Sequence, residues 1–306
     1  MESNKPKKRK KSLYRTRELH LMLLPAVIFT ALFCYLPIGG LIMAFQDFKP
    51  LLGFWKSTFV GLKQFHYIFT MPSFRQAFVN TIIIAFFKIT LSIFVPLVLS
   101  LMLNEVTKSW FKRSVQTIVF IPYFFSWAIL AGMVLEIFAY DGVINNVLES
   151  LFGMEPIAFL VSNKYFRTIV IGSDVWKGMG YNTVLLLAAI TNVDPTLHEA
   201  AQVDGAGRWK QMLHVTLPGI MPMVAVLTVL GLGGILNAGF EQILIMYNPT
   251  VEKSVDILDT LVYRLGMVSH QYSAAAAMGL FKSVISLLFV GTSYWILYKK
   301  SDYRVF

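Results

Sequence analysis

The polar residues with the most suggestive spacing lie between positions 237 and 242, inside an otherwise apolar stretch. Asn237 and Glu241 are four positions apart, so on one helix they would project from the same face. Gln242 adds a second amide beside them, and Phe240 and Tyr247 supply aromatic rings. Amides and carboxylates exchange hydrogen bonds with sugar hydroxyls, and aromatic rings stack on the apolar faces of sugars. This segment is therefore a candidate binding site for a sugar-like ligand.

No residue set in the sequence points to catalysis or to a metal. A Gly-x-x-x-x-Gly-Lys phosphate loop is absent, and no Ser, His and Asp set forms a recognisable nucleophile motif. His198 and His214 are sixteen positions apart with no other Cys or His near them, which does not fit metal-ligand spacing. Cys34 is the single cysteine and excludes an internal disulfide. We expect no catalytic residue, no metal site and no cofactor bound by this chain.

The composition is that of an integral membrane protein. Of the 306 residues, 56% are hydrophobic and only 14% are charged, whereas an average soluble domain has about 25% charged residues. The mean hydropathy is +0.61. The net charge of +10 is concentrated in the first eighteen residues and in short segments between apolar stretches, which is typical of a cytoplasmic membrane face rather than of nucleic-acid binding.

Six stretches have the length of about 20 apolar residues that a spanning helix needs. They are 19–45, 76–103, 115–139, 166–190, 219–247 and 274–298. The sequence therefore predicts an all-α integral membrane fold with six transmembrane helices over 19–300. Basic residues in the tail 1–18, in the second and fourth connections and in the tail 301–306 place both termini in the cytoplasm. We expect a multi-pass protein of the cell (plasma) membrane.

Charged and amide side chains inside these stretches need a cavity or a partner, because a charge at bilayer depth costs a few kcal/mol. Trp176, Tyr181 and Asn182 in the fourth stretch are candidates for the wall opposite Asn237. All of these polar groups could instead join this chain to a partner subunit. The further candidates are Lys88, Glu136, Asp174, Lys177 and Lys282. Among them, Glu136 and Lys282 lie near helix ends, where we expect them to reach water or to pair with another subunit.

The connection 192–218 is too long for a simple turn and must have structure of its own. Asp194 and Pro195 have the types expected of an N-cap and a first helical residue. A short amphipathic helix should follow, interrupted at Gly205, where a sharp bend is expected. Pro218 should open the next membrane helix. Taken alone, this pattern is also that of an interfacial helix lying on lipid headgroups.

The order of residues in this connection resembles a known motif. Glu199-Ala200-Ala201, then Gly205, then Leu217-Pro218 resemble the EAA loop of binding-protein-dependent ABC importer permeases of type I. The departure is Val215, where isoleucine is usual in that family. Four further stretches are similar to the branch that imports oligosaccharides derived from complex polysaccharides. They are residues 35–50, 237–242 together with 247–249, 259–264 and 279–283.

The resemblance implies a permease subunit of an ATP-driven oligosaccharide importer, whose cytoplasmic coupling loop docks on an ATPase. It implies four kinds of partner besides membrane lipid and no nucleic acid: a second homologous permease subunit, a cytoplasmic ABC ATPase dimer that binds ATP and Mg, an extracytoplasmic solute-binding protein, and the oligosaccharide. The coupling residues it implies are Glu199, Ala200, Ala201, Asp204, Gly205, Ala206, Arg208, Trp209, Leu217 and Pro218.

Two other classes of protein fit the composition. An ion-gradient-driven secondary transporter would use Glu136, Asp174 or Glu241 to bind protons or Na⁺. An intramembrane enzyme would need a catalytic constellation, and the sequence offers none. Transport with ATP, without ATP and with a collapsed ion gradient would separate the two kinds of transporter.

Overall fold

The computed structural model describes residues 17–300 except residue 235, so the predicted tails 1–18 and 301–306 lie almost entirely outside the described residues. In these residues the regular structure is helical apart from one pair of two-residue antiparallel strands. The elements in its amino-terminal half are α1 (Arg17–Thr30), η2 (Ala31–Tyr35), η3 (Leu36–Phe45), β1 (Gln46–Asp47), α2 (Gly53–Lys56), β2 (Thr58–Phe59), α3 (Lys63–Thr70), α4 (Pro72–Glu105), α5 (Ser109–Phe120), η4 (Ile121–Phe124), α6 (Trp127–Ile137) and α7 (Val143–Phe152).

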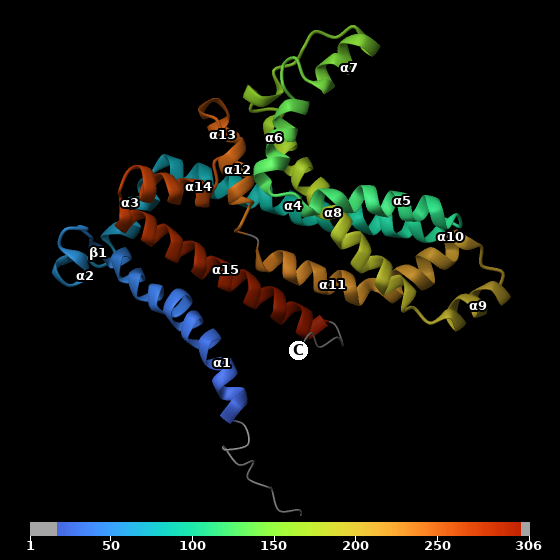
Figure 1. The fold of residues 1–306 in the computed structure, drawn as a ribbon, viewed down its shortest axis with the longest axis horizontal. Coiled ribbons are helices and arrows are strands. Elements are labelled where there is room, and N and C mark those ends of the chain that lie inside the picture. Colours follow the sequence, from blue (N-terminus) through green and yellow to red (C-terminus); the bar gives the residue numbers. More distant parts are fainter. Residues whose placement is uncertain (1–16, 235, 301–306) are drawn as a thin grey trace, which may run out of the picture.

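The carboxyl-terminal half continues the helical pattern (Figure 1). Its elements are η5 (Phe159–Val161), α8 (Phe166–Thr191), α9 (Pro195–Val203), α10 (Arg208–Gln211), η6 (Met212–Thr216), α11 (Leu217–Gly233), α12 (Phe240–Met246), η7 (Pro249–Val251), α13 (Glu252–Val255), α14 (Leu258–Tyr263), η8 (Arg264–Val268) and α15 (Tyr272–Lys300).

Four continuous helices in the described part of the chain are long and apolar enough to cross a membrane. They are Leu19–Phe45, Pro72–Glu105, Arg208–Gly233 and Tyr272–Thr292. A bent pair, Ser109–Phe124 and Trp127–Ile137, makes a fifth span if the two helices are counted together. The helix α8 has the predicted bounds to within one residue. It is not among these four, because polar residues such as Asp174 and Lys177 lower its hydropathy.

The spanning segment predicted over 115–139 is made of separate helices in the structure, which form one span only when the bent pair is counted together. The chain bends by 110° between η4 and α6. Pro122, in the first turn of η4, has no backbone N–H to continue a helical ladder. Ser126 then starts α6 as its N-cap, accepting a hydrogen bond from the Ile129 N–H at 3.4 Å. The Lys177 ammonium donates to the Phe125 carbonyl oxygen, which satisfies a backbone group that the bend frees.

The prediction of one helix over 219–247 is also wrong. The helix through α11 begins at Arg208, before Pro218, and ends at Gly233. A non-helical linker then leads to α12, which begins at Phe240. Glycines at 231, 233 and 234 weaken the helix here, and Gly239 adopts a φ of +95°, which an L side chain rarely tolerates. Pro218 lies in the first turn of α11, as predicted, and the helical path enters α11 without a break from α10 and η6.

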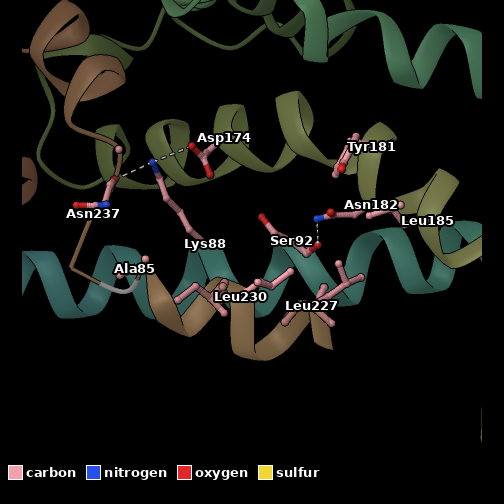
Figure 2. A pocket seen from close by; sticks show the side chains of 16 residues that line it. Ala85, Lys88, Ser92, Asp174, Tyr181, Asn182, Leu185, Leu227, Leu230 and Asn237 are labelled. Atoms are coloured by element: carbon pink, nitrogen blue, oxygen red, sulfur yellow. Dashed lines mark hydrogen bonds and ion pairs between the residues drawn. The ribbon is translucent and has the colours of Figure 1, made fainter. Parts of the chain in front are cut away.

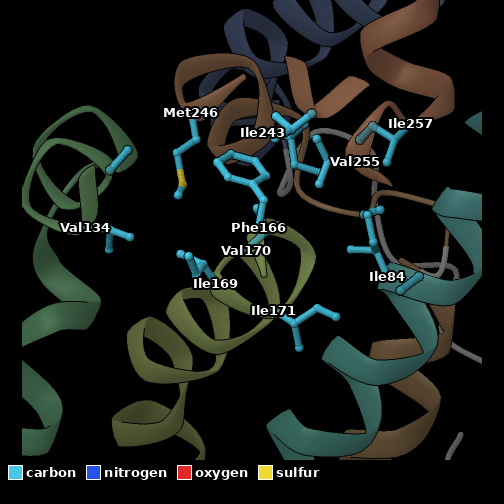
Figure 3. Close-up of a cluster of buried hydrophobic side chains, with 14 of the residues drawn as sticks. Ile84, Val134, Phe166, Ile169, Val170, Ile171, Ile243, Met246, Val255 and Ile257 are labelled. Atoms are coloured by element: carbon cyan, nitrogen blue, oxygen red, sulfur yellow. The ribbon is translucent and has the colours of Figure 1, made fainter. Parts of the chain in front are cut away.

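The core forms where α4 and α8 pack side by side, with α12 across them (Figures 1 and 3). Phe166, at the start of α8, is fully buried between Ile84 of α4 and Ile243 of α12. This cluster holds α12 and the segment after it against the two long helices. A second cluster, around Leu258 and Met278, joins η3, α3, α14 and the first turns of α15. The first cluster also contains Leu236 and Ala238 of the 234–239 linker, and Leu232 at the end of α11 packs against it.

The first span differs from the others in its exposure. Every residue from 19 to 39 is exposed, and in Figure 1 the helix α1 extends away from the bundle. Only the η3 end packs on the rest of the chain, chiefly on α15. In a bilayer, lipid or another chain must cover this apolar surface.

Candidate functional site

A cavity of about 390 Å³, called cavity 1 below, lies between α4, α8, α11 and the 234–239 linker (Figure 2). Its polar lining comes from helices far apart in the sequence, and its apolar lining comes mainly from Ile89, Leu227 and Leu230. The polar residues that line it are Lys88, Ser92, Asp174, Tyr181, Asn182 and Asn237. Apolar walls with a few convergent polar groups are typical of small-molecule sites.

The ammonium of Lys88 is the most heavily bonded group at cavity 1. It lies 3.1 Å from Asp174 Oδ1, 2.9 Å from the Ala238 carbonyl oxygen and 2.5 Å from Gln242 Oε1. Lys88 is only 6% exposed, and a buried charge is tolerated when it is paired and hydrogen-bonded. Lys88 therefore ties α4 to α8, to α12 and to the linker.

Gln242 serves this network and does not face cavity 1. Its side chain is fully buried. Its amide nitrogen donates to the Val170 carbonyl oxygen at 2.7 Å and to Ser173 Oγ at 2.8 Å, while its oxygen accepts from Lys88. The sequence placed Gln242 in the ligand pathway. The structure places it behind the wall, where it supports Lys88.

Tyr181 and Asn182 line cavity 1, as expected for a wall formed by the fourth stretch. Tyr181 stacks on Tyr123 with ring centroids 4.8 Å apart and planes 11° apart. Asn182 donates to the Ser92 carbonyl oxygen at 2.9 Å, which joins α8 to α4 on this lining (Figure 2). Trp176 lies elsewhere: it lines a separate apolar pocket with Phe138 and residues near it.

Asn237 and Glu241 do not share a helix face, because the helix is broken between α11 and α12. Asn237 lies in the linker, and Glu241 lies exposed in the first turn of α12. Asn237 lines cavity 1, whereas Glu241 lines neither cavity 1 nor the second cavity described below. The prediction that these two residues project from one helix face is therefore wrong. Spacing alone could not reveal a break set by the backbone of Gly239.

A second cavity of about 620 Å³, called cavity 2 below, lies on the other side of the linker. Phe240, Tyr263 and Tyr272 supply its aromatic lining, and Asn237 lines it as well. The Lys282 ammonium lies 2.5 Å and 2.7 Å from the two Asp259 oxygens and 2.6 Å from Asn237 Oδ1. Within this chain, Lys282 therefore pairs with Asp259 and Asn237, partners that the sequence did not suggest.

Beyond cavity 2, charged residues hold the segment between α12 and η8. Arg264 donates to Asp256 Oδ2 at 2.6 Å and to the Tyr247 hydroxyl at 3.1 Å, and it lies 3.3 Å from Glu252. Burial raises the pKa of Asp256, while hydrogen bonds from Thr260 and Arg264 act in the opposite direction. Tyr247, which the sequence placed beside a ligand, belongs to this cluster.

The region 194–217 has the local features that the sequence predicts. The Asp194 carboxylate caps α9, accepting from the Thr196 N–H at 2.9 Å, and Pro195 is its first residue. This backbone hydrogen bond lowers the pKa of Asp194. Gly205 has a φ of +76° at the bend between α9 and α10. The residues assigned to coupling are mostly exposed, Trp209 at 69% among them.

Several site residues escaped the sequence reasoning. Asp259 was not a candidate, because it lies outside the six apolar stretches, and the Lys88–Asp174 and Lys282–Asp259 pairs join residues that are far apart in the chain. Ser92 looked like an ordinary small residue in an apolar helix. Only the packing of α4, α8, α14 and α15 brings these groups to the linker.

Comparisons with known proteins give a consistent picture. Residues 88–298 match the model of the family described as binding-protein-dependent transport system inner membrane component. Protein LplB of Bacillus subtilis is 41% identical over 95% of this chain and 91% of its own length. The polygalacturonan/rhamnogalacturonan transport system permease protein YteP of the same organism is 42% identical over 94% and 90%, respectively.

A solved structure gives the same result for the fold. One chain of a bacterial ABC transporter involved in the import of the acidic polysaccharide alginate superposes with a TM-score of 0.88. The two chains are 37% identical, and the match covers 95% of this chain and 99% of the other. Identity and coverage of this size are far beyond a shared architecture alone.

Proposed function

Because the chain belongs to the family of binding-protein-dependent transport system inner membrane components, we propose that cavity 1 is part of the sugar pathway of an ATP-driven oligosaccharide importer. As a family member the chain is a non-catalytic, multi-pass permease subunit of the inner or plasma membrane. The names of two relatives support an oligosaccharide as the substrate: one is a polygalacturonan/rhamnogalacturonan permease, and another is an arabinooligosaccharide permease that is 29% identical.

The observation that carries this proposal is the lining of cavity 1. The Asp174 side chain is 27% exposed. One of its carboxylate oxygens accepts a hydrogen bond from Lys88, so the second oxygen remains available as an acceptor. Tyr181, with a hydroxyl, and Asn182, with an amide, belong to the same lining. Sugar hydroxyls both donate and accept, so a lining that does both, beside an aromatic ring, suits a neutral or acidic sugar unit.

Six crossings are part of the proposal. Four helices span on their own; the bent pair α5–α6 and the polar helix α8 supply the other two. Polar residues in α8 agree with a helix that faces a pathway, since charges at bilayer depth face cavities or partners. Six crossings put both tails, 1–18 and 301–306, on one side, and their basic residues favour the cytoplasm.

The coupling loop 192–218 is the proposed contact with the ATPase. Three large apolar side chains around the bend are exposed: Leu197 at 52%, Val203 at 88% and Trp209 at 69%. An apolar surface at the end of the bundle suits a protein partner. The proposed complex pairs this chain with a second permease subunit, two ATPase subunits that bind ATP and Mg, and a solute-binding protein. ATP and sugar would shift the pathway between inward-open and outward-open states through different affinities for the two.

Transport in vesicles tests this proposal. The complete transporter in proteoliposomes, with its sugar-loaded binding protein, should take up oligogalacturonides or arabino-oligosaccharides only when ATP is present. A collapsed proton or Na⁺ gradient should leave this uptake unchanged. Uptake that needs the gradient and ignores ATP would favour the secondary transporter instead. Absence of uptake with both sugar series would reject an oligosaccharide importer.

Variants of the lining test the site itself. Asn182→Ala removes an amide from the lining of cavity 1, so uptake and sugar-stimulated ATP hydrolysis should fall while the complex stays assembled. Glu241→Gln is informative because Glu241 is exposed and lines neither cavity. Loss of assembly in Glu241→Gln would assign that residue to the partner permease, and loss of uptake in an assembled complex would return it to the pathway.

A further inference from the structure

Cavity 2 and cavity 1 share one residue, Asn237. Cavity 1 lies along α8 and α11, toward the end of the bundle that carries α9, whereas cavity 2 lies at α14 and the first turns of α15, toward the opposite end (Figure 1). A ligand that moves along the bundle therefore meets the two cavities in sequence. Asn237 is the point where both can be contacted at once.

The orientation of the Asn237 amide is fixed by Lys282. An ammonium only donates, so it must contact the amide oxygen, and the structure has Lys282 Nζ 2.6 Å from Asn237 Oδ1. The amide nitrogen then keeps its two N–H donors for another group. Asn237 is exposed, and the hydrogen bonds of its side chain within the described chain run only to Lys282. Because Asn237 lines both cavities, these two N–H donors are available to a ligand.

The wall of cavity 2 is aromatic. The Phe240 and Tyr263 rings lie 5.9 Å apart with planes tilted by 54°, and Tyr263 is 39% exposed. Tyr272 closes the lining at the start of α15. The charged residues at its floor, Lys282 and Asp259, neutralise each other. A neutral polar floor below aromatic rings fits a sugar unit better than an ion.

We infer that cavity 2 is a second sugar subsite, and that this permease holds an oligosaccharide with units on both sides of Asn237. The inference rests on the proposed function and adds to it a minimum length for the substrate. One unit occupies cavity 1, and the next unit or units stack on Tyr263 in cavity 2 while Asn237 donates to hydroxyl oxygens of the sugar between them. Lys282 is a positioning residue, since it acts through Asn237.

Uptake as a function of sugar length tests the subsite. The complete transporter in proteoliposomes is supplied with binding protein saturated with oligogalacturonides or, as a second series, arabino-oligosaccharides of increasing length. Tyr263→Leu keeps an apolar side chain but removes the flat ring. It should reduce uptake of the longer oligomers about fivefold, the scale of one aromatic contact, and leave the shortest imported oligomer unchanged. Phe240→Leu should act in the same direction.

A matched control is Tyr140→Leu, an exposed tyrosine that lines neither cavity. It should leave uptake of every length unchanged. Equal loss for all lengths in Tyr263→Leu, or no loss at all, would overturn the subsite. Loss of the partner permease from the purified complex would also overturn it, because cavity 2 would then hold a partner side chain. A wild-type complex that imports neither series would instead reject the proposed function and the subsite with it.

Discussion

Lys88 shows how one residue can link four parts of the chain. A charge buried this far is expensive unless each of its donors has a partner, and Lys88 contacts Asp174, Gln242 and the Ala238 carbonyl oxygen. The sequence could mark Lys88 as unusual because a lysine inside an apolar helix needs an explanation. It could not name the partners, which lie 86 and more positions away.

We predict that Lys88→Met destabilises the assembled protein by about 3–5 kcal/mol, the usual cost of leaving one member of a buried pair unpaired. The double variant Lys88→Met with Asp174→Asn should recover most of this loss, since no unpaired charge remains. Thermal unfolding of the purified complex measures both. A single variant as stable as the wild type would show that water, rather than Lys88, solvates Asp174.

The Asp194 cap gives a prediction about pH. The folded protein holds the pKa of Asp194 below its ordinary value, so the cap stabilises α9 above about pH 4 and is lost as the pH falls through the lowered folded pKa. Asp194→Asn caps without a charge, so its α9 should not respond to acid in this range. Hydrogen exchange at the Thr196 amide, compared between the two proteins, measures the difference. Equal acid responses would contradict the assignment.

At the scale of elements, the decisive feature is the break between α11 and α12. Hydropathy predicted the presence of a membrane segment here correctly, because apolar residues continue on both sides of the break. It could not predict the break, because its cause is local backbone geometry at Gly239 and a lysine from another helix. The 110° bend after η4 is different: Pro122 indicates a kink in this segment, but a proline alone does not give the size of the bend.

Gly239→Ala tests the break directly. An added Cβ would lie 2.4 Å from Lys88 Nζ, and the φ of +95° is itself unfavourable for alanine. We expect Lys88 to be displaced and sugar-stimulated ATP hydrolysis to fall at least tenfold, or about 1.4 kcal/mol. Gly279→Ala, in α15, is the control, because its Cβ would meet no atom within 4 Å. Equal activity of the two variants would show that the linker tolerates movement of Lys88.

The bend at Gly205 leads to a prediction about coupling. A Cβ at Gly205 would meet no atom of this chain within 4 Å, although its φ of +76° disfavours side chains. Gly205→Asp should therefore insert and assemble with the partner permease, with sharply reduced uptake because a charge enters the proposed ATPase contact. Gly205→Asn, which tolerates this backbone conformation better, is the control for backbone strain. Normal uptake by Gly205→Asp would argue against a coupling role for this loop.

At the scale of the whole molecule, the chain provides a path and contacts but no chemistry of ATP. Its family and the motif-like residue order of the connection 192–218 can be read from the sequence because they depend on local residue order. The two cavities depend on the assembly of α4, α8, α11, α14 and α15, so no single segment reveals them. Of the predicted site, Tyr181, Asn182, Asn237 and Phe240 line a cavity, whereas Gln242, Glu241 and Trp176 do not line either one.

The purified chain, freed of every ATPase subunit, should hydrolyse no ATP, because the sequence has no phosphate-binding loop. Phosphate release in detergent or nanodiscs measures this, with the complete transporter as the positive control. Hydrolysis that persists after the partner subunits have been removed, and that scales with the amount of this chain, would contradict the assignment of ATP chemistry to separate subunits.

The exposed first span has a consequence for how the protein is made. It is synthesised before the other spans described here, and its residues 19–39 contribute almost nothing to the buried core. It is thus inserted ahead of those spans and is separate from the segments that stabilise the finished domain. If this helix were first placed incorrectly, moving it would cost little free energy, because few native contacts would have to be broken before η3 packs on α15.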